Sequence, residues 1–398
     1  MMPSYSVRCA VTRPGEPTGT PTSASLTFAT ADAVVSLDPS PPIEFDLAEV
    51  VGLEPSGGEL HVTLQSGLVL RLSGMGKTSA ELVTGLARVR RDRIAYVFRF
   101  GLQSSDRWEE ADVLAPGESS PRRSGLRLFG SLLGIVPDRG EPQAIPFGDV
   151  RAITFDEAAY EVVVETAAGK WRIGRLARRS VPVLEELKRA RLEFVARYQA
   201  QLKDVMPHLA AHALQQLSGD WCEGIAMPAV SLDQRAPGTA ARFLEFLPSG
   251  ERRAFVDQLA QHFGHAPCFG WYYSAAADAD TTRLFEPFVL FQNSVPGGFA
   301  AAWEVLSAMG TATYIFRGAE PDLAAKLNEA LRSIRFAREP IYLSQAELLT
   351  TGEHRHHVPL LERSDDLKFL RARFAGRVSH VEPETYAARV AALCGEPA

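Results

Sequence analysis

Glycines, a lysine and two hydroxyl residues stand together in Gly74-Met-Gly-Lys-Thr-Ser79, between a strand-like and a helix-like segment. Glycine-rich loops of this kind hold nucleotide phosphates with backbone amides and a lysine, but the motif needs a glycine five residues before Gly76. That position is Arg71. A related stretch later in the chain, residues 175–180, has no glycine at all. The pattern therefore favours a strand-to-helix turn over a nucleotide site.

What these two turns share is positive charge. Lys77 lies in the first turn, and Arg175, Arg178 and Arg179 lie in the second. Clustered guanidinium groups bind phosphate oxygens, so these four residues are candidates for an anionic ligand such as an acidic lipid headgroup. Other basic residues accompany them: Arg88, Arg90, Arg91, Arg93, Arg122 and Arg123. The alternative is solvated arginine, because the chain has 36 arginines and only six lysines and uses arginine throughout.

Three possible metal ligands, His262, His265 and Cys268, are spaced H-x2-H-x2-C. Imidazole and thiolate are the ligands that zinc prefers. More imidazoles follow within residues 354–357, but no fourth ligand can be identified. The alternative is a buried cysteine flanked by exposed histidines.

Nucleophilic catalysis finds no support in the sequence, which has no Gly-x-Ser-x-Gly elbow and no cysteine–histidine signature. The segment Asn293–Phe299 is glycine-rich and is predicted to connect a strand to a helix, where a ligand loop could lie. Two glycines after a proline are more typical of an ordinary turn. No catalytic residue and no cofactor are predicted.

The elements that must position these residues form one module of about a hundred residues written twice. Residues 43–54 align with residues 145–156 at an offset of 102, so that Ile43, Phe45, Val51 and Leu53 match Ile145, Phe147, Ile153 and Phe155. After residues 67 and 169 the offset becomes 101. Such ordered self-similarity indicates a tandem duplication.

Upstream of this stretch the likeness is looser. Leu26 and Phe28 match Leu126 and Leu128, and the Pro-Gly-Glu of residues 14–16 matches that of residues 116–118. Residues 5–8 match residues 96–99 at an offset of 91, which predicts an insertion near residues 102–115.

Each copy has several short strands with period-two alternation and then one amphipathic helix, at residues 79–91 and from residue 181 to 197 or beyond. Strands followed by a single closing helix resemble the pleckstrin-homology-like (PH-like) fold, especially its small bacterial versions. The resemblance covers residues 4–195. It implies small antiparallel sheets that serve as binding platforms, and basic loops that can hold lipid phosphates.

The remaining chain predicts an α+β or α/β domain. The second helix is expected to continue toward Leu217, with a kink at Pro207. Further helices are expected at 249–263, 299–308, 321–334, 365–374 and 384–393, and strands at 268–274, 288–293, 312–317 and 340–344. The fold class is therefore α+β. The predicted domains are 1–92 and 93–197 (PH-like repeats), 198–248 (helical connector and loop) and 249–398 (a mixed C-terminal domain).

Composition limits the function classes. The net charge of −6 argues against nucleic acid as a partner, and no apolar run reaches the length of a membrane span. The first residues lack a secretory signal, and four distant cysteines suit reduced thiols in a cytoplasm.

Three hypotheses follow. The first is a non-enzymatic scaffold that uses the tandem modules to bind a protein partner. The second is a peripheral binder of anionic membrane lipid. The third is an enzyme with an unrecognised site within residues 218–398.

Overall fold

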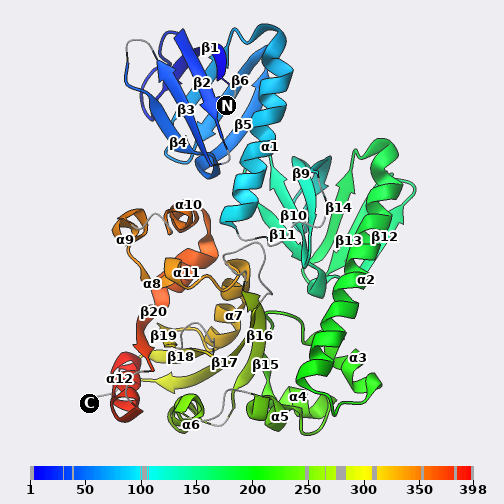
Figure 1. The fold of residues 1–398 in the computed structure, drawn as a ribbon, viewed down its shortest axis with the longest axis vertical. Coiled ribbons are helices and arrows are strands. Elements are labelled where there is room, and N and C mark those ends of the chain that lie inside the picture. The colour runs from blue at the N-terminus through cyan, green and yellow to red at the C-terminus, as the bar shows by residue number, and fades with distance from the viewer. Residues whose placement is uncertain are drawn as a thin grey trace. The chain divides into compact units, whose positions relative to one another are not determined.

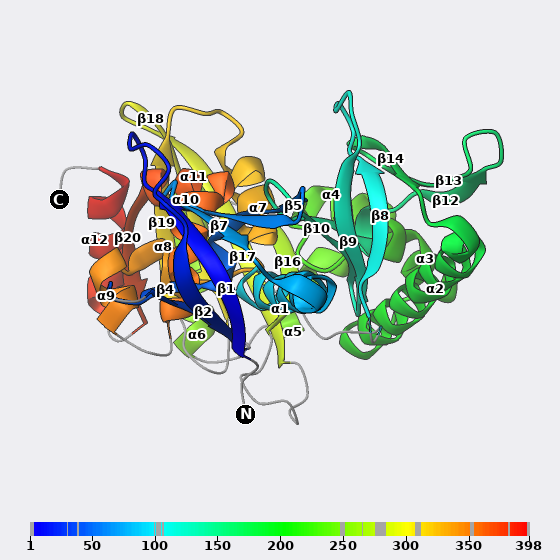
Figure 2. The ribbon, with the colours of Figure 1, turned by 90° about the horizontal axis from the view of Figure 1, so that it is seen from above.

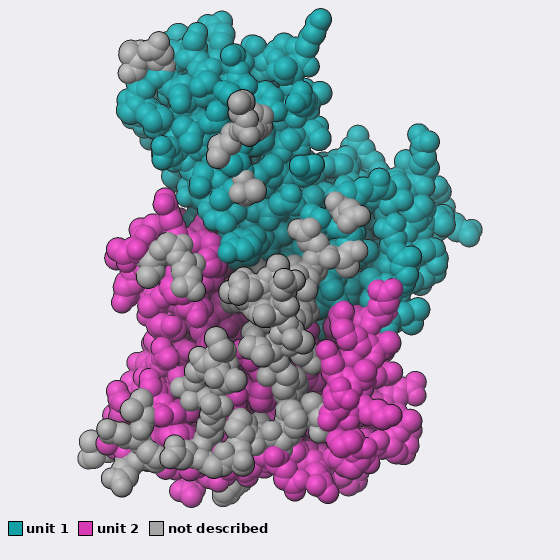
Figure 3. All heavy atoms as spheres, in the orientation of Figure 1, with its two compact units in different colours: residues 1–192 teal, residues 193–398 magenta. Residues whose placement is uncertain are grey.

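The computed structural model describes residues 4–29, 31–37, 40–98, 100, 105, 107–246, 251–264, 266–274, 284–306, 312–350, 354–380 and 383–395. The chain divides into two compact units, residues 1–192 and residues 193–398 (Figure 3).

The first module is one antiparallel sheet of seven strands in the order β4-β3-β2-β1-β7-β6-β5. Its strands are β1 (Ser4–Thr12), β2 (Thr22–Phe28), β3 (Asp32–Leu37), β4 (Ile43–Asp46), β5 (Val50–Ser56), β6 (Glu59–Leu64) and β7 (Val69–Ser73). Alternate side chains such as Leu60, Val62 and Leu64 are buried, as the period of two in the sequence predicts. Helix α1 (Ser79–Val97) closes this sheet through Leu82 and Leu86.

The second module repeats this topology, with the order β11-β10-β9-β8-β14-β13-β12. Its strands are β8 (Glu109–Leu114), β9 (Arg122–Phe129), β10 (Leu132–Pro137), β11 (Gln143–Pro146), β12 (Ala152–Asp156), β13 (Glu161–Thr166) and β14 (Gly169–Gly174), and helix α2 (Ser180–Val205) follows. The predicted α+β class and the duplication are confirmed. Two seven-stranded antiparallel sheets, each followed by a helix, fit tandem PH-like modules.

The correspondence between the copies differs from the sequence alignment by two residues in the Ile-x-Phe region. A 3₁₀ turn begins at Leu47 in the first module and at Phe147 in the second, and both residues are buried. The offset here is therefore 100, and Phe45 corresponds to Ile145. It becomes 102 after the β12–β13 turn, because four residues connect Asp156 to Glu161, whereas two connect Ser56 to Glu59.

The alignment of residues 5–8 with residues 96–99 is wrong, because Tyr96 lies in α1. Strand pairing matches β1 with β8: Cys9 pairs with Thr22 and Leu72, and Val113 pairs with Arg122 and Ile173. The insertion predicted near residues 102–115 is therefore wrong as well, since this stretch holds the strand equivalent to β1.

Helix α1 belongs to both modules and lies between their strands in two perpendicular views (Figures 1 and 2). Its first half packs on the first sheet. Its last turns, with Ile94 and Ala95, pack against Phe100, Phe129 and Leu132 of the second module. Helix α1 therefore has one apolar face near its start, which packs on the first module, and another near its end, which packs on the second. The two modules are joined because they share this helix.

The second unit contains a six-stranded antiparallel sheet in the order β15-β16-β17-β18-β19-β20. The strands are β15 (Met227–Pro228), β16 (Cys268–Ser274), β17 (Leu284–Val295), β18 (Gly298–Val305), β19 (Ala312–Gly318) and β20 (Phe374–Ser379). The helices are α3 (Ala211–Asp220), α4 (Ala229–Arg235), α5 (Thr239–Phe246), α6 (Glu251–Phe263), α7 (Leu323–Ser333), α8 (Glu339–Tyr342), α9 (Gln345–Thr350), α10 (Val358–Arg363), α11 (Asp365–Arg373) and α12 (Pro383–Cys394).

Most predicted elements of this unit are confirmed, and three expectations are wrong. Residues 299–308 were expected to be helical because of their alanines, but residues 299–305 lie in β18, where pairing with β17 and β19 overrides propensity. The segment Asn293–Phe299 is thus the end of a β-hairpin, in which β17 and β18 are joined by a turn at Pro296 and Gly297. The strand predicted at 340–344 is largely α8, and α2 ends at Val205 rather than continuing toward Leu217, before Pro207 and a separate α3.

The segment 198–248, predicted as a connector and loop, contributes to the core of the second unit. Trp221, Leu232 and Phe243 from this segment are fully buried there. The domain boundaries predicted at 92, 197 and 248 stay predictions. None of the described helices is long and apolar enough to cross a membrane.

Candidate functional site at the junction of the two modules

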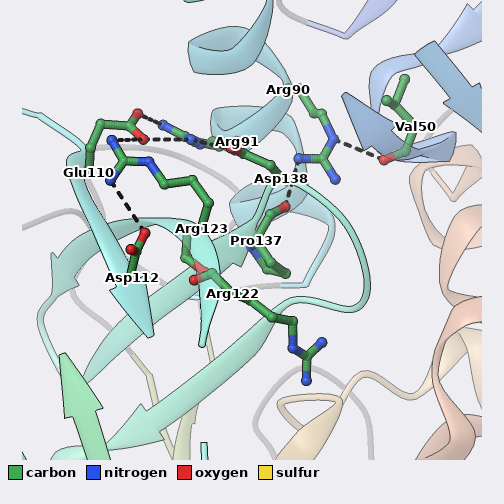
Figure 4. Close-up of polar contacts among 10 residues, drawn as sticks. Val50, Arg90, Arg91, Glu110, Asp112, Arg122, Arg123, Pro137 and Asp138 are labelled. Carbon is green, nitrogen blue, oxygen red and sulfur yellow. Dashed lines mark hydrogen bonds and ion pairs between the residues drawn. The ribbon is translucent and has the colours of Figure 1, made fainter. Parts of the chain in front are cut away.

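Arg90 of α1 is buried and connects the two modules through its guanidinium (Figure 4). Its Nε donates to the carbonyl of Val50 in β5 at 2.9 Å, and its Nη1 donates to the carbonyl of Pro137 in β10 at 3.0 Å. One planar group thus binds backbone carbonyls from both sheets. This arrangement fixes the β5 edge of the first module against the end of β10 in the second.

Arg91 is also buried and forms ion pairs with Glu110 and Asp138 of the second module (Figure 4). Burial disfavours the charged form, but Glu110 and Asp138 together raise the pKa of Arg91 above its ordinary value. Its guanidinium lies so close to Gly125 that a Cβ there would come within 3 Å of it. Glycine is therefore required at position 125 by close approach.

The β5 edge pairs with a short segment of the second module, residues 138–140, through one antiparallel β-bridge between Gly52 and Arg139. Leu53 N donates to Asp138 O at 3.0 Å, and Gly140 N donates to Val51 O at 3.2 Å, in antiparallel pairing. Arg139 lies 3.5 Å from Glu54 and adds an exposed ion pair. The edge of one module is therefore already used as a binding site for an extended chain.

A cavity of about 430 Å³ lies at this junction. Its charged and aromatic lining consists of Arg88, Arg91, Asp92, Arg107, Trp108, Glu110, Arg127 and Asp138. Arg127 donates to Asp92 at 2.7 Å, and the Trp108 indole donates to the same carboxylate at 2.9 Å. Both modules contribute to the wall, since Leu53 and Val83 complete it from the first.

A second cavity, of about 340 Å³, lies in the second module between β9 and α2. Four arginines line it, Arg107, Arg127, Arg179 and Arg189, together with Glu109 and Glu186. Arg179, one of the predicted anion ligands, contacts Glu109 at 2.8 Å and Glu186 at 3.1 Å. These contacts raise the pKa of Arg179, and an anion at this site would compete with two carboxylates.

The other predicted anion ligands lie outside this cavity. Lys77 and Arg178 are exposed in equivalent 3₁₀ turns of the two modules, and Arg175 is exposed 3.7 Å from Asp112. The prediction that the four residues bind an anion stays a prediction. The cavity arginines at positions 107, 127 and 189 were missed, because they come from separate elements and share no sequence spacing.

The turn around Lys77 explains the glycines that resembled a phosphate loop. Gly74 and Gly76 adopt positive φ angles of 71° and 54°. Their counterparts Arg175 and Ala177 have φ angles of 59° and 50°. The same left-handed turn therefore exists in both modules, and the glycines serve its backbone conformation.

For the predicted metal ligands, the structure places His262 in the last turn of α6 and Cys268 at the start of β16. His265 lies outside the described residues. Burial raises the pKa of the Cys268 thiol. Among the described residues no group of three or more possible metal ligands gathers. The prediction that His262, His265 and Cys268 bind a metal stays a prediction.

The second unit contains two buried sets of polar side chains that the sequence did not indicate. Glu304 of β18 pairs with His380 at 2.9 Å and accepts a hydrogen bond from Thr313. On the opposite face of the sheet, the Tyr272 hydroxyl donates to Glu286 at 2.6 Å, and burial with this carboxylate raises the Tyr272 pKa well above its ordinary value. The available signal in the sequence was one glutamate within an apolar stretch of each strand, Leu-Phe-Glu-Pro-Phe-Val-Leu-Phe in β17 and Phe-Ala-Ala-Ala-Trp-Glu-Val in β18.

No protein-family model and no curated protein sequence matches the chain. Among solved structures, the chain is similar to a chain described as "Structure of the Spt16D Pob3N heterodimer". That similarity has a TM-score of 0.17 and 16% sequence identity, and it covers 42% of this chain and 84% of the other. Because this TM-score is low, the assignment of the fold rests on the strand order of the two sheets and not on this similarity.

Proposed function

We propose that the chain is a protein-interaction scaffold in which two PH-like modules act as one binding body. Repeated small sheets offer edges and loops to a partner without any reacting group. A scaffold gains affinity when its binding surfaces are already arranged, because less conformational freedom is lost on association.

The observation that carries this proposal is the shared helix with its buried Arg90. A guanidinium that binds carbonyls at 2.9 Å and 3.0 Å in two different sheets leaves little freedom between the modules. Flexible modules on a linker would not need such a contact.

The proposal is tested by affinity capture from an extract of the host, with the full chain and a chain of residues 193–398 as matched baits. We expect specific partners on the full chain that are lost from the shorter bait. Identical partners on both baits would contradict an interaction role for residues 1–192.

A second candidate function is binding of an anionic ligand, favoured by the four arginines around the cavity of the second module. Co-sedimentation with vesicles at low salt, with and without acidic lipid, tests a membrane source. We expect binding that depends on acidic lipid and weakens in Arg179→Ala but not in Arg88→Ala. Absence of binding at low salt would exclude the lipid form of this function.

A further inference from the structure

The duplication allows the occupied β5 edge to be compared with its equivalent in the second module, the outer strand β12 (Figure 1). Strand register matches Leu53 with Ile153 and Glu54 with Thr154. In the first module, Val51 O and Leu53 N bind the added segment. Within the described part of the chain, the equivalent Arg151 O and Ile153 N have no partner, and Thr154 is exposed.

The helix preserves the arginine that accompanies this edge. Arg191 Nε donates to Val150 O at 3.1 Å, just as Arg90 Nε donates to Val50 O. Arg90 then uses Nη1 to bind the carbonyl of Pro137, the last residue of β10 and the one directly before the docked segment. Among the described residues, no carbonyl accepts a hydrogen bond from the Nη groups of Arg191. The second copy therefore has the arginine that accompanies the docked segment in the first copy, but no described segment is docked beside it.

The side chains that select the docked segment differ between the two edges. In the first module, Arg91 binds Asp138 and Glu54 binds Arg139 of that segment. Their equivalents are Leu192, which is 67% exposed, and Thr154. A strand at the second edge would therefore meet an apolar side chain and a neutral one where the first edge offers two charges.

We propose that the β12 edge binds an extended segment of a partner protein by antiparallel strand addition. Arg191 binds a backbone carbonyl of that segment, and Leu192 selects an apolar residue at the position that Asp138 occupies in the internal complex. An unprotected edge strand is a ready template for such pairing, with affinity from main-chain bonds and specificity from side chains. This inference rests on the proposed interaction function and names the chemistry of its partner.

The test uses the full chain and two labelled peptides in fluorescence polarisation. One has the native sequence of residues 135–142, Ile-Val-Pro-Asp-Arg-Gly-Glu-Pro, and the other carries D138L. We expect the D138L peptide to bind about tenfold more tightly, because the native carboxylate meets Leu192 unpaired. Leu192→Arg recreates the first edge and should reverse the preference. Val181→Arg, at an exposed apolar position in the first turn of α2, should not.

Ile153→Pro removes the donor on the open edge and should abolish binding of both peptides, with an unchanged circular dichroism spectrum as the folding control. Absence of binding by either peptide, or a preference unchanged by Leu192→Arg, would overturn the proposal. Self-association of the wild type in sedimentation that Leu192→Arg abolishes would also overturn it, since a second copy would then occupy the edge.

The affinity captures separate this failure from a failure of the proposed function. Partners that need residues 1–192 but still bind the Ile153→Pro variant would support the scaffold role and contradict binding at the β12 edge.

Discussion

Arg90 is the residue on which the joining of the two modules most depends. Arg90→Met keeps much of the side-chain volume but leaves the carbonyls of Val50 and Pro137 without their donor. We expect a loss of about 3 kcal/mol in the free energy of unfolding, since each buried unsatisfied group costs roughly 1–3 kcal/mol. Urea titration measures it. Arg88→Met, at an exposed position on the same helix, should change stability by less than about 0.5 kcal/mol, and an equal loss in both variants would contradict the role given to Arg90.

The sequence could not show this role. Arginines on the first helix favoured a solvated face or an anionic ligand, yet Arg90 and Arg91 are buried. Helical periodicity indicates which face is apolar, but it does not indicate that a second module covers the polar residues near the end of the helix.

The turns before the two helices provide a matched pair of backbone tests. Ala177 has a φ of 50°, so Ala177→Gly should stabilise the second module by about 1 kcal/mol by removing strain. Gly76 has a φ of 54° and open space around it, so Gly76→Ala should destabilise the first module by about the same amount. Thermal unfolding of both variants measures the changes. Shifts of the same sign would show that the turns are not equivalent.

Tyr314 makes the stability of the second unit sensitive to alkaline pH. Burial raises the pKa of Tyr314 to about 12. The unfolded chain ionises this group near pH 10 while the folded chain keeps it neutral, so its contribution is complete below about pH 10 and is lost toward pH 12. Urea unfolding from about pH 9 upward should show a stability loss that is shallower in Tyr314→Phe, by up to about 1.4 kcal/mol per pH unit. An identical slope in both proteins would contradict this assignment.

At the scale of elements, α1 is predicted to make the two modules unfold together. Ile94 is fully buried against the second module although its helix closes the first. Ile94→Ala should cost about 3 kcal/mol and should raise amide exchange in the strands of both modules. Hydrogen exchange resolved by peptide checks this. Faster exchange confined to β8–β14 would show that the modules unfold independently.

The same scale shows what the sequence could predict. Alternation and amphipathic periodicity correctly indicated two strand-rich modules with a closing helix each. They misaligned the two copies by two residues around Phe45. Both copies contain an Ile-x-Phe sequence, at residues 43–45 and 145–147, and aligning these two sequences places the two extra residues of the second copy before them. The structure shows that the extra residues lie later, in the β12–β13 turn. In the second unit, the alanine-rich β18 looked helical, since pairing on both of its edges is invisible in local propensity.

For the whole molecule, the candidate site was harder to predict than the fold. Strand patterns repeat in the sequence, whereas the contacts that join the two modules connect residues about 40 to 50 positions apart, such as Val50 with Arg90 and Arg90 with Pro137. Of the predicted anion ligands, Arg179 lines the cavity of the second module, and Lys77, Arg175 and Arg178 lie outside it. The proposal for the β12 edge comes from comparing the two copies, since the β5 edge pairs with residues 138–140 and β12 is the outer strand of its own sheet.

The central claim is that residues 1–192 form one rigid body, and a distance measurement between the modules tests it most directly. Spin labels introduced as non-natural amino acids at Lys77 and Arg178, both exposed, leave the four native cysteines in place. Pulsed electron paramagnetic resonance on the full chain should give a single narrow distance distribution that broadens in Arg90→Met. A broad distribution in the unsubstituted chain would contradict the account.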